Sequence, residues 1–209
     1  MTGGMLSDVA RATGQHLFIV AIAVLTATAA GIPIGVLVLR HRRTGRVVLR
    51  LIDIIQTIPS LALFGFLIPL PFLGGIGMRT AIVALILYSL LPIVRNTVTG
   101  IAGIDPLVRE AAIVVGMDQR QRLFSVELPL ALPSIFGGLR IATVLAIGVA
   151  TIGAAVGGGG LGTLIFRGVA MVDTTLIVAG ALPAAGLAVI ADLLFGALER
   201  WAARRFGSA

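Results

Sequence analysis

The chain has 209 residues, of which 58% are hydrophobic and 12% charged, whereas soluble domains carry about twice that share of charge. All sixteen basic residues are arginine, and the absence of lysine excludes a standard phosphate-binding P-loop. Cysteine is also absent, and only His16 and His41 offer imidazole groups. We therefore expect no catalytic residue, no metal site and no cofactor in this chain.

The formal net charge of +7 does not indicate nucleic-acid binding. The arginines sit in short clusters at the ends of apolar runs, as in membrane proteins. No basic stripe with interleaved aromatic residues is present, which single-strand binding would require.

Five apolar segments approach or exceed the roughly 20 residues that cross a bilayer as a helix. They are expected at residues 17–39, 51–73, 80–101, 134–156 and 176–198. Pro59, Pro69 and Pro71 interrupt the second segment, and Gly31 and Gly35 in the first allow close helix packing. The predicted fold class is an all-α integral membrane protein with one transmembrane domain over residues 1–209, located in the cell membrane.

The arginines predict the orientation of these spans. One set of connecting segments holds Arg11, Arg79 and Arg167. The other set holds Arg40, Arg42, Arg43, Arg46, Arg50, Arg109, Arg120, Arg122, Arg200, Arg204 and Arg205. By the positive-inside rule the richer set is cytoplasmic, so the N-terminus is outside and the C-terminus inside. The first segment is expected to be retained, because its charge cluster follows the apolar core, unlike a signal peptide.

The hydrophilic segment at residues 103–133 lies between the third and fourth spans. Asp105 and Pro106 are typical of a helix start, with Asp as N-cap and Pro in the first turn. Gly116 is typical of a helix end. The helix between them places one set of apolar residues on a common side, namely Leu107, Ala111, Val114 and Val115.

A second short helix is predicted after Gly116. Asp118 and Gln121 have the spacing of a capping box. The helix is expected to stop near Glu127, because Pro129 disfavours a helical conformation at the residue before it. Two interpretations remain open, namely a docking site for a partner protein and an amphipathic loop on the lipid headgroups.

Four ionisable residues fall inside the apolar spans, namely Asp53, Arg95, Arg140 and Asp192. Charges in hydrocarbon are costly, so they are expected to find partners. We predict an ion-pair network near the cytoplasmic ends of spans two to five, around an inner gate. The alternative is that each side chain extends to the interface. The candidates for the pore or gate are Thr57, Pro59, Ser60, Asn96 and Thr151, although a structural role explains such residues more readily than substrate contact.

The segment reads Glu110-Ala111-Ala112, three residues, Gly116, nine residues, then Val126-Glu127-Leu128-Pro129. This spacing resembles the EAA loop of bacterial binding-protein-dependent ABC importer permeases, a MetI-like type I fold. The one departure is valine where the family pattern has isoleucine. The resemblance implies a coupling-helix pair that docks on an ATPase subunit. The residues implied are Glu110, Ala111, Ala112, Gly116, Leu128 and Pro129.

Further segments are similar to the osmoprotectant branch of that family, whose substrates are glycine betaine, carnitine and choline. They are residues 56–60, 91–96, 130–133 and 157–162. The resemblance covers most of residues 17–200. It implies a permease dimer, identical or paralogous, ATPase subunits that hold ATP and Mg²⁺, and an extracytoplasmic binding protein.

The aromatic content fits a division of labour in which another chain recognises the substrate. Quaternary ammonium groups are gripped by aromatic cages, but this chain has only Tyr88 and Trp201 besides its phenylalanines. Three alternatives remain. They are a permease for methionine or another amino acid, a standalone channel or secondary transporter, and an intramembrane enzyme. No internal repeat supports the second, and no nucleophile–base set supports the third.

Overall fold

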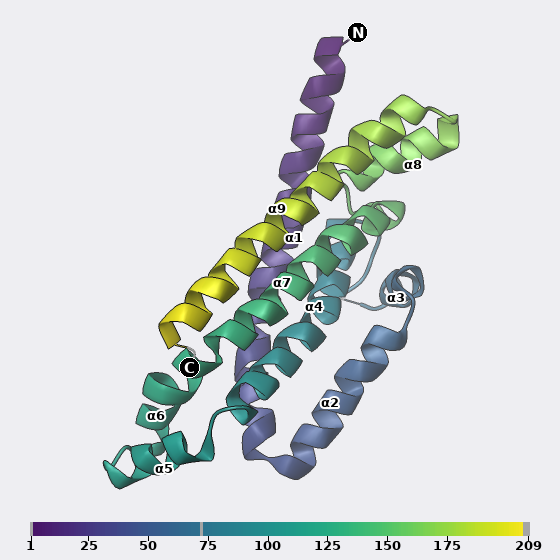
Figure 1. Ribbon diagram of the computed structural model, residues 1–209. Coiled ribbons are helices and arrows are strands. Elements are labelled where there is room, and N and C mark those ends of the chain that lie inside the picture. Colours follow the sequence, from purple (N-terminus) through teal and green to yellow (C-terminus); the bar gives the residue numbers. More distant parts are fainter. Residues whose placement is uncertain (1, 72, 207–209) are drawn as a thin grey trace.

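The computed structural model describes residues 2–71 and 73–206, and within these ranges every regular element is helical (Figure 1). In chain order the helices are α1 (Thr2–Arg40), α2 (Arg42–Thr57), α3 (Ser60–Leu67), α4 (Met78–Ala102), α5 (Pro106–Val114), α6 (Gln119–Arg122), the π-helical turn η1 (Leu123–Glu127), α7 (Leu128–Gly153), the 3₁₀ turn η2 (Ala154–Val156), α8 (Gly162–Met171) and α9 (Thr174–Phe206). The C-terminal end of α9 lies at the same end of the bundle as α5 and α6, and the start of α1 lies at the other (Figure 1).

Four helical runs are long and apolar enough to cross a membrane. They are Gly4–Arg40, Met78–Ala102, Gln119–Val156 and Thr174–Phe206. They contain the predicted first, third, fourth and fifth spans, so the all-helical membrane fold is confirmed. Each helix extends beyond the predicted apolar segment, because capping and polar residues at the ends continue the same hydrogen-bond pattern.

The second predicted span, at residues 51–73, is not one helix. α2 ends at Thr57 and α3 starts at Ser60, and the two axes differ by 104°. The break lies at Ile58, which has φ −72° and ψ 125° because Pro59 excludes a helical conformation before it. A fifth span exists only if this bent pair counts as one. Phe72, inside the predicted range, lies outside the described residues.

Small residues allow the central helices to pack closely. A Cβ atom added to Gly35 of α1 would lie 2.7 Å from Cβ of Thr97 in α4, and one on Gly31 would lie 2.8 Å from Ile93. A Cβ on Gly138 of α7 would lie 2.7 Å from that of Asn96. The close approach predicted for the Gly31–Gly35 pair is therefore confirmed.

The main buried cluster lies where α1, α4 and α7 meet. Its largest members are Ile19, Val20, Val24, Leu85 and Ile147.

α8 lies in a stretch for which the sequence predicted no helix. It packs on α9 through glycines: a Cβ on Gly168 or Gly180 would lie within 2.8 Å of Ile177 or Ile165. A second buried cluster, with Ile101, Ile104, Ala131 and Ile135, packs the start of α7 on the end of α4, next to the segment that contains α5 and α6.

Candidate functional site

The hydrophilic segment between α4 and α7 forms two short helices that meet at a glycine, and residues 105–127 are termed the elbow. α5 starts after Asp105, whose carboxylate accepts a hydrogen bond from the Leu107 N–H at 2.8 Å, and Pro106 lies in its first turn. The chain turns at Gly116, whose φ of +88° is strained for any residue with a Cβ. The predicted start and end of this helix are confirmed.

The second helix of the elbow begins with the predicted capping box. The Asp118 carboxylate accepts hydrogen bonds from the N–H groups of Arg120 and Gln121 at 2.7 and 2.8 Å. In return, the side-chain oxygen of Gln121 accepts one from the Asp118 N–H at 2.9 Å. Two unpaired donor groups are thus satisfied reciprocally, which stabilises the start of α6 without help from another element.

The prediction that this helix stops near Glu127 is wrong. α6 continues through η1 directly into α7. In this wider turn the Leu128 N–H bonds to the Leu123 carbonyl, five residues earlier. Pro129, which lacks an N–H, therefore enters the first turn of α7 without breaking the helix. Leu128 and Pro129 are half-buried there.

The residues implied for coupling differ in exposure. Glu110, Ala111 and Gly116 are exposed, and Glu110 makes no ion pair among the side chains that the structure describes. Ala112 is only 6% exposed, so its methyl group is covered by this chain. The family pattern of two small residues therefore combines one outward and one inward position.

Large apolar side chains are exposed along the elbow. Val114 is 86% and Val115 78% exposed. The elbow patch is defined as Leu107, Ile113, Val114, Val115 and Phe124. Exposed apolar patches of this kind are typical of surfaces that contact a protein or a membrane.

Glu127 ties the two halves of the elbow together. Its Oε1 atom lies 3.4 Å from Nε of Arg109 on α5 and 3.6 Å from Nε of Arg122 on α6. Arg109 also donates a hydrogen bond to the Ile101 carbonyl at the end of α4. Sequence reasoning did not assign this role to Glu127. The one signal for this role in the sequence was that Glu127 is an acidic residue in a segment with several arginines.

The four intramembrane charges form two separate pairs and not one network. Arg95 of α4 contacts Asp53 of α2 at 2.7 Å. Arg140 of α7 binds Asp192 of α9 through two parallel hydrogen bonds of 2.6 and 2.8 Å. Arg140 also lies 3.5 Å from Glu199, a partner that the sequence did not suggest. These pairs connect α2 to α4 and α7 to α9.

Three of the five pore candidates are hydrogen-bonded within their own helix. Thr57 and Thr151 donate to the carbonyls of Ile54 and Gly148, and Asn96 donates to that of Pro92 at 2.8 Å. The other two, Pro59 and Ser60, lie at the bend between α2 and α3. Among the described residues, no hydrogen bond joins any two of the five.

The bend itself is held by two contacts that sequence reasoning missed. The side-chain amide of Gln56 donates to the Tyr88 carbonyl at 3.0 Å. The Tyr88 hydroxyl donates to the Ile58 carbonyl. α4 thus holds the end of α2 and the break at Ile58, and the Ile58 carbonyl has a hydrogen-bond donor.

The glycine-rich segment after α7 is bound by α1. The Gly160 N–H donates to Oε1 of Gln15 at 3.1 Å. His16 is fully buried, and its Nε2 lies 3.2 Å from the Ile147 carbonyl of α7. These contacts join residues 145 and 131 positions apart, so no local signal predicted them.

Comparisons with known proteins agree on one family. Residues 18–205 match the family described as "Binding-protein-dependent transport system inner membrane component". The osmoprotectant import permease protein OsmW of Salmonella typhimurium is 48% identical over 189 residues, 90% of this chain and 88% of OsmW. The glycine betaine/carnitine/choline transport system permease protein OpuCD of Bacillus subtilis is 48% identical over 187 residues, 89% of this chain and 80% of OpuCD.

A solved structure has the same fold. A chain of the MetNI methionine ABC transporter, in an inward-facing conformation, superimposes with a TM-score of 0.87. The match covers 97% of this chain and 99% of that one, at 23% sequence identity. The overall path of the chain is therefore the one seen in that transporter.

Proposed function

Because this chain belongs to the family of binding-protein-dependent transport system inner membrane components, we propose that it carries a quaternary-amine osmoprotectant across the membrane. It is a permease subunit of an ABC importer, in which a separate ATPase subunit hydrolyses ATP. The substrate class proposed is glycine betaine, choline and carnitine. The observation that carries it is 48% identity, over about nine-tenths of this chain, to one permease named for osmoprotectant import and one named for glycine betaine, carnitine and choline transport.

A methionine permease is a weaker alternative. The likeness to the MetNI chain rests on 23% identity, and it concerns the fold alone. The test is uptake by proteoliposomes that contain the permease, its ATPase and its binding protein. Labelled glycine betaine, choline and carnitine should be taken up in an ATP-dependent manner, and methionine should not. Uptake of methionine alone, or uptake without ATP, would overturn the proposal.

We further propose that the elbow is the docking site for the ATPase subunit. The support is the exposed elbow patch, beside which Glu110, Ala111 and Gly116 are also exposed. The ion pairs of Glu127 join both helices of the elbow to each other, and Arg109 joins them to α4. A displacement of the elbow would thus be transmitted to α4 through Arg109. It would be transmitted to α7 through η1, which continues into α7 without a break.

The proposed assembly is a dimer of permeases with two ATPase subunits and an extracytoplasmic binding protein, and this chain contributes residues 1–209 as one domain. The end of the bundle that carries the elbow is proposed to face the cytoplasm, with the N-terminus outside, because most arginines lie at that end. The pairs Arg95–Asp53 and Arg140–Asp192 are proposed to position the helices around an inner gate.

A further inference from the structure

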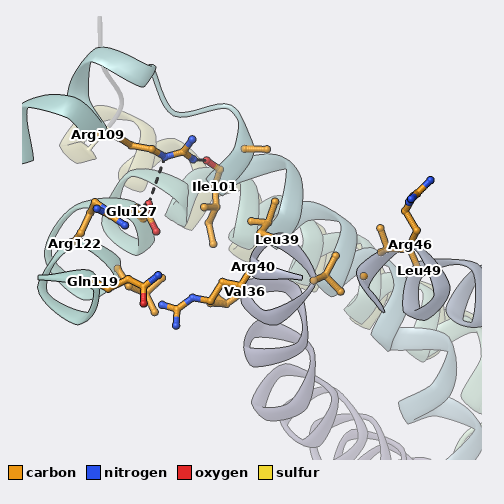
Figure 2. Close-up of a pocket in the computed structure, with 14 residues that line it drawn as sticks. Val36, Leu39, Arg40, Arg46, Leu49, Ile101, Arg109, Gln119, Arg122 and Glu127 are labelled. Carbon is orange, nitrogen blue, oxygen red and sulfur yellow. Dashed lines mark hydrogen bonds and ion pairs between the residues drawn. The ribbon is translucent and has the colours of Figure 1, made fainter. Parts of the chain in front are cut away.

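A cavity of about 600 Å³ separates the elbow from the corner between α1 and α2. Its walls come from the end of α1, the start of α2, the end of α4, and the elbow. Figure 2 shows the cavity with the elbow along one side and α1 along the other. It is distinct from the elbow patch, whose residues do not line it.

The cavity carries an excess of positive charge. Arg40, Arg46, Arg109 and Arg122 line it, and Glu127 is the one acidic residue among its lining side chains. Figure 2 shows Arg109 and Arg122 beside Glu127, and Arg40 extending toward Gln119 on the elbow side. Each guanidinium offers five N–H donors in a fixed fork, so one carboxylate cannot satisfy all four groups.

Unused donors confirm this imbalance. Nε of Arg109 is buried and has no hydrogen-bond partner among the described residues, because its 3.4 Å contact with Glu127 is an ion pair without hydrogen-bond geometry. Arg40 is exposed and makes no ion pair with any described acidic side chain. Planar guanidinium groups with free donors bind phosphate oxygens well.

An apolar groove adjoins the cavity at the same corner. It has a volume of about 510 Å³ and is lined mainly by Ile34, Leu37 and Val48. Val38 and Gly45 line both spaces, so the two meet where α2 crosses α1. The two helices approach closely at this point, since a Cβ atom added to Gly45 would clash with the backbone of Val38. A charged cavity next to an apolar groove at the end of membrane-spanning helices matches a lipid in both polarity and position.

We propose that this cavity binds the phosphate headgroup of an anionic phospholipid, with part of an acyl chain in the adjoining groove. A bound headgroup would connect Arg40 of α1 to Arg109 and Arg122 of the elbow. It would therefore fix the distance between the first helix and the segment proposed to receive the ATPase. The proposal concerns binding alone and does not depend on which substrate is carried.

The test uses the complete permease–ATPase complex in nanodiscs that contain phosphatidylglycerol and phosphatidylcholine. Native mass spectrometry then counts the lipids that stay bound. The complex should retain phosphatidylglycerol in preference, and Arg40→Gln should reduce this retention roughly fivefold, the effect of one arginine near an anionic lipid. Arg40→Gln leaves both ion pairs of Glu127 in place. Arg40→Lys should preserve most of the retention.

The matched control is Arg79→Gln, which removes an exposed arginine at the other end of α4 and should change nothing. Arg122→Gln provides a second variant inside the cavity. Equal retention of phosphatidylglycerol by wild type, Arg40→Gln and Arg122→Gln would overturn the proposal. Displacement of the lipid by inorganic phosphate at equal concentration would also overturn it, because the occupant would then be a soluble anion.

Discussion

The imidazole of His16 lies against Gly160, so that a Cβ atom on Gly160 would be 2.9 Å from Nδ1 of His16. Gly160 also has φ +73°, and its N–H is bound by Gln15 of the same helix. α1 therefore holds the glycine-rich segment in a conformation that only glycine adopts without strain. This contact links the first helix to the loop between α7 and α8.

Gly160→Ala should destabilise the protein, because it meets both the steric contact with His16 and the positive φ. The backbone strain alone costs about 1–2 kcal/mol. Thermal melting of the purified complex in detergent should show a clear decrease. Gly186→Ala on α9 is the control, since a Cβ there meets no atom within 4 Å. Equal melting of the two variants would show that α1 does not constrain the segment.

Val114→Asp should weaken binding of the ATPase roughly tenfold or more, as expected when an apolar interface anchor worth about 2 kcal/mol is lost. The measurement is co-purification of the ATPase with tagged permease. Val172→Asp is the matched control, because Val172 is 89% exposed against 86% for Val114 and lies after α8, away from the elbow. Full recovery of ATPase with Val114→Asp would exclude the elbow patch as the docking site.

Asp118→Ala should destabilise the start of α6 by about 1 kcal/mol, because two backbone N–H groups lose their hydrogen-bond acceptor. Amide hydrogen exchange in residues 119–122 should become roughly fivefold faster, with weaker coupling of ATP hydrolysis to uptake. Asp118→Asn is the control, because asparagine caps helices about as well. If the alanine and asparagine variants exchange at the same rate, the capping box does not order the elbow.

Arg140→Ala should reduce uptake to near background, because it leaves Asp192 and Glu199 without their common partner in a membrane-spanning helix pair. Arg140→Lys should restore only part of the activity, since lysine cannot make the two parallel hydrogen bonds. Arg95→Ala tests the second pair, with Asp53. Near-normal uptake by both alanine variants, at normal expression, would rule out a role for these pairs in the gate.

Local signals predicted the elbow well. The caps at Asp105 and Asp118 and the turn at Gly116 all appear in the structure as expected. Each depends on hydrogen bonds between residues two to four positions apart, which the sequence displays directly. The stop near Glu127 was wrong because the rule for residues before proline assumes a regular α-helix, whereas a π-helical turn precedes Pro129.

The sequence by itself determined the membrane-spanning helical class, the elbow and the residues that had to find charged partners. Periodicity, capping and the cost of charge in lipid act on single segments, so they are visible without the fold. Only the tertiary structure decided that Arg140 pairs with Asp192, 52 positions away, and that α1 binds the glycine-rich segment. It also decided that the arginines of α1 and the elbow face one cavity. Such contacts depend on how close glycines let the helices approach, which no short stretch of sequence specifies.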